Sequence, residues 1–322
     1  MSILKSRPIV TVVTPVFNEE LGLDGYVEAV TASLLASGET DFRILFVDDG
    51  STDGSWRKIE AICAGSKHFS AIRLSRNFGA HVALSAGIDH AEGDAVATLA
   101  CDLQDAPETI LEFVEAWQRG AQIVWGVRRT RQESRLRQVT TDIFINLIRR
   151  YAMPKGSKFT TGSFLLMDRK VADCFRQFRE HSRVTFALVA WTGFDQDVVL
   201  YDRRARKIGS SGWTLSKLLR TIYDTLIGFS ELPARLITLV GLCTFAGSML
   251  FLIYLIVLKL VANVAPGWTG LMALMTLLFG ILFMMVGMMA EYMYRIFLES
   301  TNRPLYFVSR ALEPDKPSVP HE

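Results

Sequence analysis

The first part of the chain alternates between short apolar runs and longer amphipathic stretches. Continuous runs rich in β-branched residues are typical of strands buried on both faces of a parallel sheet. Such runs predict five strands, at residues 9–14, 42–47, 69–74, 95–99 and 122–126. Apolar residues at helical spacing predict helices between them, over 21–36, 80–90 and 107–119 and around Trp56, Ile59 and Ile62. This alternation predicts an α/β fold with a doubly wound, mostly parallel sheet.

The pattern is less regular after the fifth predicted strand. Residues 143–151 predict an amphipathic helix, and residues 160–169 predict a turn, a short strand and the start of a helix. An apolar helix is expected over 184–191 and a late strand over 197–201. Together these elements predict one cytosolic domain over residues 1–212.

Hydrophobic residues are concentrated after residue 232. The stretch at 236–258 and a second at about 271–292 are each long and apolar enough to cross a bilayer as a helix. Basic residues flank this region, with Arg235 before it and Arg295, Arg303 and Arg310 after it. The positive-inside rule therefore predicts a transmembrane hairpin over residues 233–298, with the domain and both termini in the cytosol. The chain is expected to be an integral protein of the bacterial inner membrane or an equivalent membrane.

Residues 213–232 lie directly before the first predicted span. Apolar residues between 214 and 230 recur at i, i+3, i+4 and i+7, which predicts an amphipathic helix. A core helix would show the same pattern, but the position next to a span favours a helix that lies on the bilayer surface. Residues 299–322 are expected to form a cytosolic tail, whose last dozen residues are rich in proline and charge and predict disorder.

Composition narrows the class of protein. Half of the 322 residues are hydrophobic and the formal net charge is only +2, so no nucleic-acid partner is expected. The four cysteines are scattered and form no Cys-x-x-Cys pair, which favours reduced thiols and gives no metal–thiolate site. No apolar stretch precedes the first predicted strand, so a cleavable signal peptide is not expected.

Polar side chains gather where three predicted strands end. They are Asn18 and Glu19, then Asp48 and Asp49, then Asp102 and Gln104. Open α/β sheets bind ligands beyond the carboxyl ends of their strands. Asp102 and Gln104 leave the same face of an extended segment, and two such oxygen ligands suit Mg2+ or Mn2+ holding a diphosphate. The alternative for this stretch is a strand followed by a helix that Asp105 caps.

A basic segment follows the fifth predicted strand. Its arginines are Arg128, Arg129, Arg131, Arg135 and Arg137. These side chains could hold phosphates or anionic lipid headgroups, and the alternative is a solvated loop. A second basic cluster contains Arg203, Arg204, Arg206 and Lys207. Neither a Gly-x-Gly-x-x-Gly after the first strand nor a P-loop occurs, which disfavours dinucleotide and P-loop proteins.

Six motifs occur in order along the chain. They are TPVFNEE, VDDGSTDGS, SRNFG, CDLQDAPE, TGSFLLMDRKV and AEYMYRIFLESTNRPLYF. Together they resemble the polyprenyl-phosphate glycosyltransferases, a membrane-anchored branch of the family-2 glycosyltransferases with a GT-A fold. That branch includes dolichyl-phosphate mannose synthases, bactoprenol glucosyltransferases and the undecaprenyl-phosphate aminoarabinose transferase. The resemblance extends over nearly the whole chain, including the two predicted spans.

The resemblance implies a reaction. A nucleotide-sugar linked to UDP or GDP, with UDP-glucose expected first, would bind at the strand ends with Mg2+ or Mn2+. The phosphate of undecaprenyl or dolichyl phosphate would then displace the nucleoside diphosphate with inversion at the sugar. The product would be a polyprenyl-phosphate sugar for cell-envelope glycan or lipid modification. A homo-oligomer would be compatible with the family.

The resemblance also implies roles for individual residues. The nucleotide-sugar would contact Pro15, Phe17, Glu19, Val47, Asp49, Asp102 and Gln104. Asp102 and Gln104 would also bind the metal, with the donor diphosphate, waters and Asp105 completing its shell. Arg128 would face the phosphates or the acceptor, and Arg206 matches a phosphate-binding arginine, so both join Asp102 in the predicted catalytic set.

The chain departs from the family pattern at several positions. The family's Asp-x-Asp-x-Gln begins here with Ala100, its acidic residues are replaced at Thr160 and Ser163, and an expected lysine falls on Gly212. Proteins often hold Mg2+ with one or two carboxylates plus phosphates and waters, so weakened metal binding is still expected. The alternative function is a catalytically impaired homologue that binds nucleotide or lipid within a membrane complex.

Overall fold

The protein is described by a computed structural model. The structure describes residues 7–129, 164–178, 180, 184–204, parts of 239–257, 267–301 and 303–313. Contacts divide the chain into two compact units, one of Met1–Ile222 with Pro304–Glu322 and one of Tyr223–Arg303. The first unit is therefore discontinuous in sequence. The predicted helices at 143–151 and 214–230 and the turn at 160–163 lie outside the described residues.

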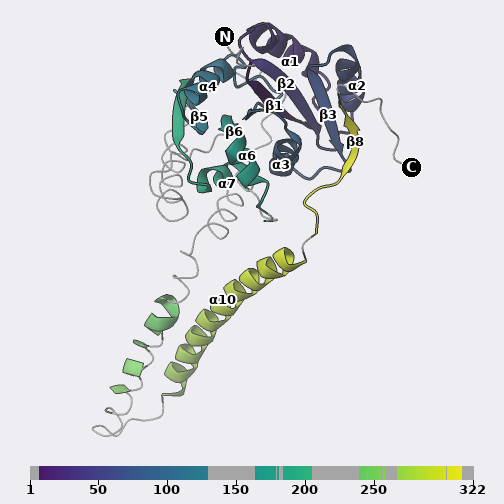
Figure 1. Ribbon diagram of the computed structural model, residues 1–322. Coiled ribbons are helices and arrows are strands. Elements are labelled where there is room, and N and C mark those ends of the chain that lie inside the picture. The colour runs from purple at the N-terminus through teal and green to yellow at the C-terminus, as the bar shows by residue number, and fades with distance from the viewer. Residues whose placement is uncertain are drawn as a thin grey trace. The chain divides into compact units, whose positions relative to one another are not determined.

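An eight-stranded sheet forms the centre of the first unit, with strand order β7-β5-β6-β4-β1-β2-β3-β8 (Figure 1). Its strands are β1 (Ile9–Val16), β2 (Asp41–Asp48), β3 (Phe69–Leu74), β4 (Ala95–Thr98), β5 (Ile123–Arg128), β6 (Leu165–Asp168), β7 (Gln196–Tyr201) and β8 (Val308–Leu312). The pairs β1–β2, β1–β4, β2–β3 and β5–β7 are parallel. The pairs that contain β6 or β8 are antiparallel. The sheet is thus Rossmann-like and mixed, which confirms the predicted α/β class.

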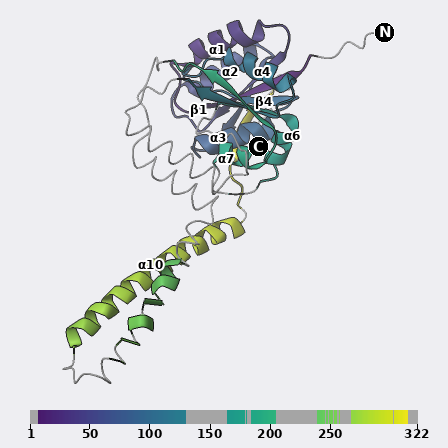
Figure 2. The same ribbon diagram turned by 90° about the vertical axis from the view of Figure 1, so that its left-hand side faces the viewer.

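Helices cover both faces of this sheet. They are α1 (Leu23–Val30), its π-helical continuation η1 (Thr31–Leu35), α2 (Ser55–Gly65), α3 (Ala80–His90), α4 (Thr109–Gln118), α6 (Arg169–Phe175) and α7 (Thr185–Trp191). Figure 2 shows α1, α2 and α4 on one face and α3, α6 and α7 on the other. The two-sided cover explains why β1, β2 and β4 are continuous apolar runs, since both of their faces are buried.

Close approach of α3 to the sheet depends on a glycine. A Cβ atom placed on Gly87 would clash with the side chains of Val13 and Val47. On the opposite face, the rings of Tyr26, Phe46 and Phe69 pack in succession, with centroids 5.9 Å apart in each pair. All five of these side chains are buried, so the central strands pack closely on both faces.

The segment after α10 (Trp268–Ser300) contains a strand that the sequence did not predict. Residues 299–322 were expected to form a cytosolic tail with no predicted strand, and within them Val308–Leu312 forms β8 along the edge of β3. The register pairs Arg73 with Arg310 and Ala71 with Leu312. An edge strand presents unpaired backbone N–H and C=O groups, and β8 satisfies those of β3 on that side. The apolar Leu312 packs against the core, whereas the rest of β8 is exposed.

The second unit contains one long helix, α10 (Trp268–Ser300). Within it, Leu277–Tyr294 is long and apolar enough to cross a membrane, by length and composition. A shorter apolar helix runs over Leu239–Phe251, inside the first predicted span. Of the two expected spans, the described residues thus support the second, and they do not establish a two-helix hairpin. The helix α10 extends beyond the predicted limits of 271–292 at both ends.

Candidate active site

The loops that follow β1 and β2 are joined by reciprocal hydrogen bonds. The backbone N–H of Asn18 donates to Ser51 Oγ (3.0 Å), and that of Thr52 donates to Asn18 Oδ1 (2.9 Å). The N–H of Glu19 donates to Ser55 Oγ (3.0 Å) at the start of α2. Asn18 has a φ of 54°, a left-handed conformation that asparagine tolerates better than most residues. These contacts fix the backbone on which Phe17 and Glu19 stand.

The predicted nucleotide-binding residues on β1 and β2 differ in accessibility. Phe17 is 45% exposed directly after β1, so its ring is open to a ligand. Pro15 and Glu19 are half-buried. Val47 is fully buried, with its side chain under α3 near Gly87. A ligand could therefore reach the aromatic ring of Phe17, whereas the side chain of Val47 offers it no surface.

Asp49 holds the loop before α3. Its Oδ1 accepts the N–H of Phe78 (2.7 Å) and its Oδ2 accepts the N–H of Gly79 (2.9 Å). Burial raises the pKa of Asp49, and the two backbone N–H groups oppose that rise. The adjacent Gly50 has a φ of 68° and lies so close to the backbone of Arg76 that a Cβ would clash there. Asp49 thus positions the SRNFG motif, a role that the sequence did not predict.

The stretch after β4 carries the predicted metal ligands. Asp102 and Gln104 are both half-buried, and Asp102 Oδ1 accepts the N–H of Gln104 (3.2 Å). Leu103 between them has a φ of 51°. Asn18 and Leu103 are the non-glycine residues with positive φ in the described parts of the chain, and both follow strand ends. Unfavourable backbone conformations of this kind gather at functional sites, where surrounding contacts sustain them.

Acidic side chains from two strand ends lie near one buried thiol. Burial raises the pKa of Cys101, and the negative charges of Glu19 and Asp102 raise it further. The loops after β1 and β4 follow neighbouring parallel strands, so Glu19 and Asp102 lie at the same edge of the sheet.

A second cluster lies at the ends of β5 and β7. The hydroxyl of Tyr201 donates to Asp105 Oδ1 (2.5 Å), and Arg203 Nε lies 3.5 Å from the same oxygen. Burial raises the pKa of Tyr201, as does Asp105, while Arg128 lowers it. The N–H of Arg204 donates to the carbonyl oxygen of Gln104 (2.9 Å). These contacts bring Arg128 to the same edge of the sheet as the Asp102 turn.

The geometry around Asp105 corrects one sequence interpretation. The residue at the N-cap of α4 is Glu108, so Asp105 does not cap that helix. Asp105 is 5% exposed and is engaged by Tyr201 and Arg203, which also places it poorly to complete a cation's shell. Tyr201 was not predicted as a site residue, and Arg203 and Arg204 were predicted only as members of a basic cluster, because their partners lie about a hundred positions earlier in the chain.

The remaining predicted residues divide into two groups. Arg129 is exposed and donates its backbone N–H to Tyr201 (2.9 Å), and Ala100 is half-buried after β4. The others fall outside the described residues, namely Arg131, Arg135, Arg137, Arg206, Thr160, Ser163 and Gly212.

The oxygen ligands near the site suit a cation that binds together with a diphosphate. Within the described residues, no three His, Cys, Asp or Glu side chains are grouped so that they could hold a metal ion. Asp102 offers a carboxylate and Gln104 an amide oxygen on one turn. Mg2+ and related ions are commonly held by one or two carboxylates together with substrate phosphates and waters. The residues therefore fit a metal–diphosphate complex better than a metal bound by the protein alone.

Comparisons with known proteins identify the family. The model of the family described as glycosyl transferase family 2 matches residues 11–176, a little over half of the chain. An uncharacterized glycosyltransferase of Synechocystis sp. is 36% identical over 301 residues, covering 93% of this chain and 94% of that protein. An SfII prophage-derived bactoprenol glucosyl transferase of Shigella flexneri is 32% identical over 304 residues, covering 94% and 98%.

Comparison with solved structures gives lower sequence identity. Glucosyl-3-phosphoglycerate synthase from Mycobacterium tuberculosis, in complex with Mn2+, UDP-glucose and phosphoglyceric acid, gives a TM-score of 0.48 at 19% identity. That likeness covers 69% of this chain and 79% of the other. The matched family model and the relatives at more than 30% identity carry the assignment. The chain belongs to glycosyltransferase family 2, which confirms the resemblance that its motifs predict and makes it an enzyme of sugar transfer.

Proposed function

We propose that this enzyme transfers a sugar from a nucleotide-sugar to a polyprenyl phosphate, with inversion at the anomeric carbon. The observation that carries the proposal is that Glu19, Asp102, Gln104 and Arg128 all follow or end strands at one edge of the sheet. The similarity to bactoprenol glucosyl transferases over 94% of the chain favours a polyprenyl phosphate as the acceptor. It also favours UDP-glucose as the first donor to test.

Different residues would bind the nucleoside and the diphosphate of the donor. Phe17, Glu19 and the Asp49 turn would bind the nucleoside, with the exposed ring of Phe17 available to stack on the base. Asp102 and Gln104 would hold the diphosphate end through Mg2+ or Mn2+. When bound, the cation supplies positive charge where the leaving nucleoside diphosphate gathers negative charge. Arg128 would add a further positive charge at the same edge.

The acceptor needs little activation by a general base. A polyprenyl phosphate is already an anion near neutral pH, so one of its oxygens can attack the anomeric carbon without losing a proton. The new bond forms between that oxygen and the anomeric carbon, while the bond from the anomeric carbon to the nucleoside diphosphate breaks. Arg206 and the basic segment at 128–137 are candidates to orient the acceptor phosphate.

A membrane anchor would place the active site at headgroup depth. The apolar stretch Leu277–Tyr294 supports one span, and the apolar helix Leu239–Phe251 is the candidate for a second. We propose that residues 213–232 lie on the bilayer surface and that the catalytic unit faces the cytosol, where nucleotide-sugars are made available. A homo-oligomer is compatible with this arrangement.

A catalytically impaired homologue is the second candidate function, and Ala100 is the observation that favours it. The alanine stands where a second carboxylate would otherwise face the cation. In the Ala100→Asp variant, an impaired binder would gain turnover that the natural chain lacks. In an active enzyme, the same change would at most lower the metal concentration needed for half-maximal activity.

The test is a donor screen with the full chain purified in detergent. The protein is incubated with undecaprenyl phosphate, Mn2+ or Mg2+, and labelled UDP-glucose, other UDP-sugars or GDP-mannose. A labelled lipid that forms with one donor, and that requires both the acceptor and the cation, supports the proposal. Folded protein that labels no lipid with any donor contradicts it.

A further inference from the structure

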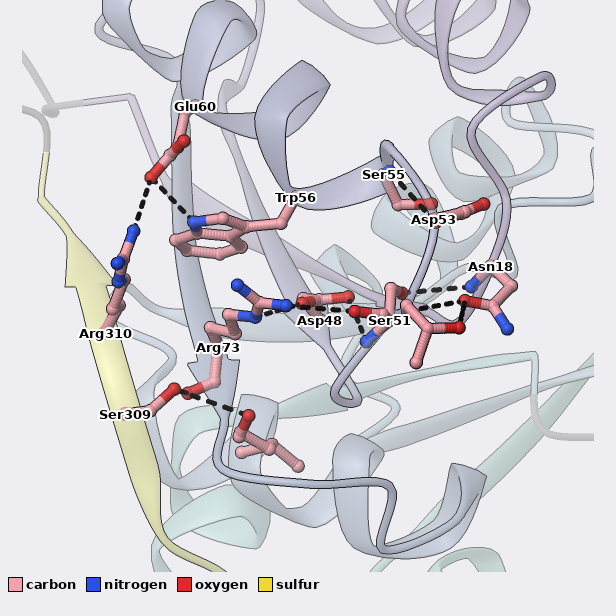
Figure 3. Close-up of polar contacts among 12 residues, drawn as sticks. Asn18, Asp48, Ser51, Asp53, Ser55, Trp56, Glu60, Arg73, Ser309 and Arg310 are labelled. Carbon is pink, nitrogen blue, oxygen red and sulfur yellow. Dashed lines mark hydrogen bonds and ion pairs between the residues drawn. The ribbon is translucent and has the colours of Figure 1, made fainter.

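The strand β8 joins the catalytic sheet next to a continuous polar network. It pairs with β3, and Ser309 Oγ donates to the carbonyl oxygen of Arg73 (3.1 Å). Arg310 Nη1 lies 3.3 Å from Glu60 Oε1, which also accepts the indole N–H of Trp56 (2.6 Å). Figure 3 shows these contacts running from β8 to the start of α2. The backbone of β8 therefore pairs with β3, and its side chains contact β3 and α2.

Arg73 continues this network toward the donor edge. Its guanidinium carbon lies 5.5 Å from the centre of the Trp56 ring, a cation–π distance. Its Nε lies 3.0 Å from Asp48 Oδ2, and its Nη2 donates to the carbonyl oxygen of Ser51 (2.9 Å). The guanidinium thus joins the Trp56 ring to the turn that follows β2.

Arg73 supplies the counter-charge for a buried carboxylate, that of Asp48. The side chain of Asp48 is fully buried at the last residue of β2, and burial raises its pKa against the opposing effects of Ser51 and Arg73. A buried carboxylate requires a fixed counter-charge or hydrogen bonds. Asp48 Oδ1 accepts the N–H of Ser51 (3.2 Å), and Ser51 Oγ in turn accepts the N–H of Asn18 (3.0 Å) (Figure 3). Arg73 therefore fixes the turn whose next residues support Phe17 and Glu19.

We propose that Arg73 is a positioning residue for the donor nucleotide and that β8 is the element that holds it in place. The inference rests on the proposed function, because it assumes that a nucleotide binds beside the 48–51 turn. The two events are then thermodynamically linked: docked β8 raises nucleotide affinity, and bound nucleotide stabilises the docking of β8 by the same factor.

The first experiment measures nucleotide affinity in matched variants of the full chain in detergent. UDP and GDP, each with Mn2+, are titrated calorimetrically into the natural protein and into Arg73→Gln, Arg73→Lys and Arg310→Gln. We expect roughly tenfold weaker binding for Arg73→Gln, partial rescue by Arg73→Lys, and a several-fold loss for Arg310→Gln. Lys58→Gln is the control, because Lys58 lies on α2 but pairs with the exposed Asp24 outside the network.

A kinetic readout separates positioning from general destabilisation. The KM for the nucleotide-sugar should rise in the Arg73 and Arg310 variants, while the KM for polyprenyl phosphate stays unchanged. Equal changes in both KM values would show a merely structural role and overturn the inference. Natural protein that binds neither UDP nor GDP would contradict the proposed function itself, whereas natural protein that binds alongside unaffected variants would contradict only the role of Arg73 and β8.

Hydrogen exchange on the natural protein supplies a test that needs no variant. Saturating nucleotide with Mn2+ should slow amide exchange in residues 308–312, which lie on the opposite side of β3 from the donor-site loops. Exchange in α6, which packs on β4 and β6 and carries no proposed donor-site residue, serves as the internal reference. Unchanged exchange at 308–312 under saturating nucleotide would overturn the proposal.

Discussion

Asp102 is the residue on which the proposed chemistry depends most. It is half-buried on a turn held by its bond to the N–H of Gln104 and by the left-handed Leu103. Ala100 removes one carboxylate from the neighbourhood, so no second acid of the family motif can replace Asp102 there. The whole negative charge that the motif offers a cation is therefore concentrated on one side chain.

Replacing Asp102 with asparagine should lower kcat by about 10²-fold or more, because the amide keeps the shape of the side chain but loses its charge. The rate of labelled-lipid formation at saturating donor measures the effect. Asp24→Asn is the control, since Asp24 is an exposed acid on α1 paired with Lys58. Metal-dependent turnover at the rate of the natural protein in the Asp102 variant would contradict the assignment.

The burial of His81 leads to a prediction about how the stability of the fold depends on pH. His81 lies in the first turn of α3, 4.9 Å from the ring of Phe186, and burial lowers its pKa to about 4. A histidine with a depressed folded pKa stabilises the fold above its unfolded pKa of roughly 6.5, and that contribution is lost as the pH falls toward the folded value.

The native chain should therefore lose about 2 kcal/mol of stability from this group between pH 7.5 and pH 5. His81→Gln removes the titration, so its unfolding temperature should fall less over the same interval. Thermal unfolding of both proteins in detergent at the two pH values measures the difference. A variant whose acid sensitivity equals that of the natural chain would show that His81 is not responsible.

At the scale of elements, continuous apolar runs predicted the central strands, because both faces of these strands are buried. The strand β8 could not be predicted in this way, since most of its five residues are exposed and form no apolar run. Its existence depends on the unpaired edge of β3, more than two hundred residues earlier in the chain. The antiparallel direction of β6 likewise follows from pairing with β4 and β5, which no local pattern encodes.

The candidate site shows the same division. Asp102, Gln104 and Glu19 could be predicted because the carboxyl ends of parallel strands converge. Two other contacts could not be predicted in this way. The hydroxyl of Tyr201 donates to Asp105, and Asp49 accepts the N–H groups of Phe78 and Gly79. Each is a hydrogen bond between positions that lie far apart in the chain. The sequence thus predicted the edge of the sheet at which the proposed site lies, while the supporting contacts required the tertiary structure.

Two helical glycines give opposite predictions for the same substitution. Gly87 faces Val13 and Val47 across the contact between α3 and the sheet, so Gly87→Ala should cost about 1–3 kcal/mol through overpacking. Gly25 lies on the exposed side of α1, where an added Cβ would meet no atom within 4 Å, so Gly25→Ala should stabilise by about 0.5–1 kcal/mol. Thermal unfolding of both variants in detergent tests the pair, and destabilisation of equal size in both would contradict it.

At the scale of the whole molecule, the length of α10 bears on membrane insertion. Its 33 residues correspond to about 50 Å of helix, well over the thickness of a bilayer's hydrocarbon core. The helix is thus long enough to cross and still continue beyond the apolar region. Its apolar stretch, Leu277–Tyr294, is the part expected to lie in the hydrocarbon.

Leu282→Arg should therefore shift a large fraction of the protein from the membrane pellet to the supernatant after an alkaline wash. An arginine near the centre of a span costs about 2.5–3.5 kcal/mol on insertion scales. Leu282→Ala is the control, because it shortens the side chain without adding charge. Equal retention of both variants would argue against α10 as a span.

The discontinuity of the catalytic unit has a consequence for biosynthesis. Its sheet needs β8, yet β8 is translated only after Tyr223–Arg303, the segment that contains α10. While the ribosome is still making that segment, the earlier strands can assemble, but the edge of β3 stays open. The last strand therefore reaches the sheet only after the apolar helix has left the ribosome. Vectorial synthesis would thereby make completion of the catalytic sheet follow synthesis of the apolar helix.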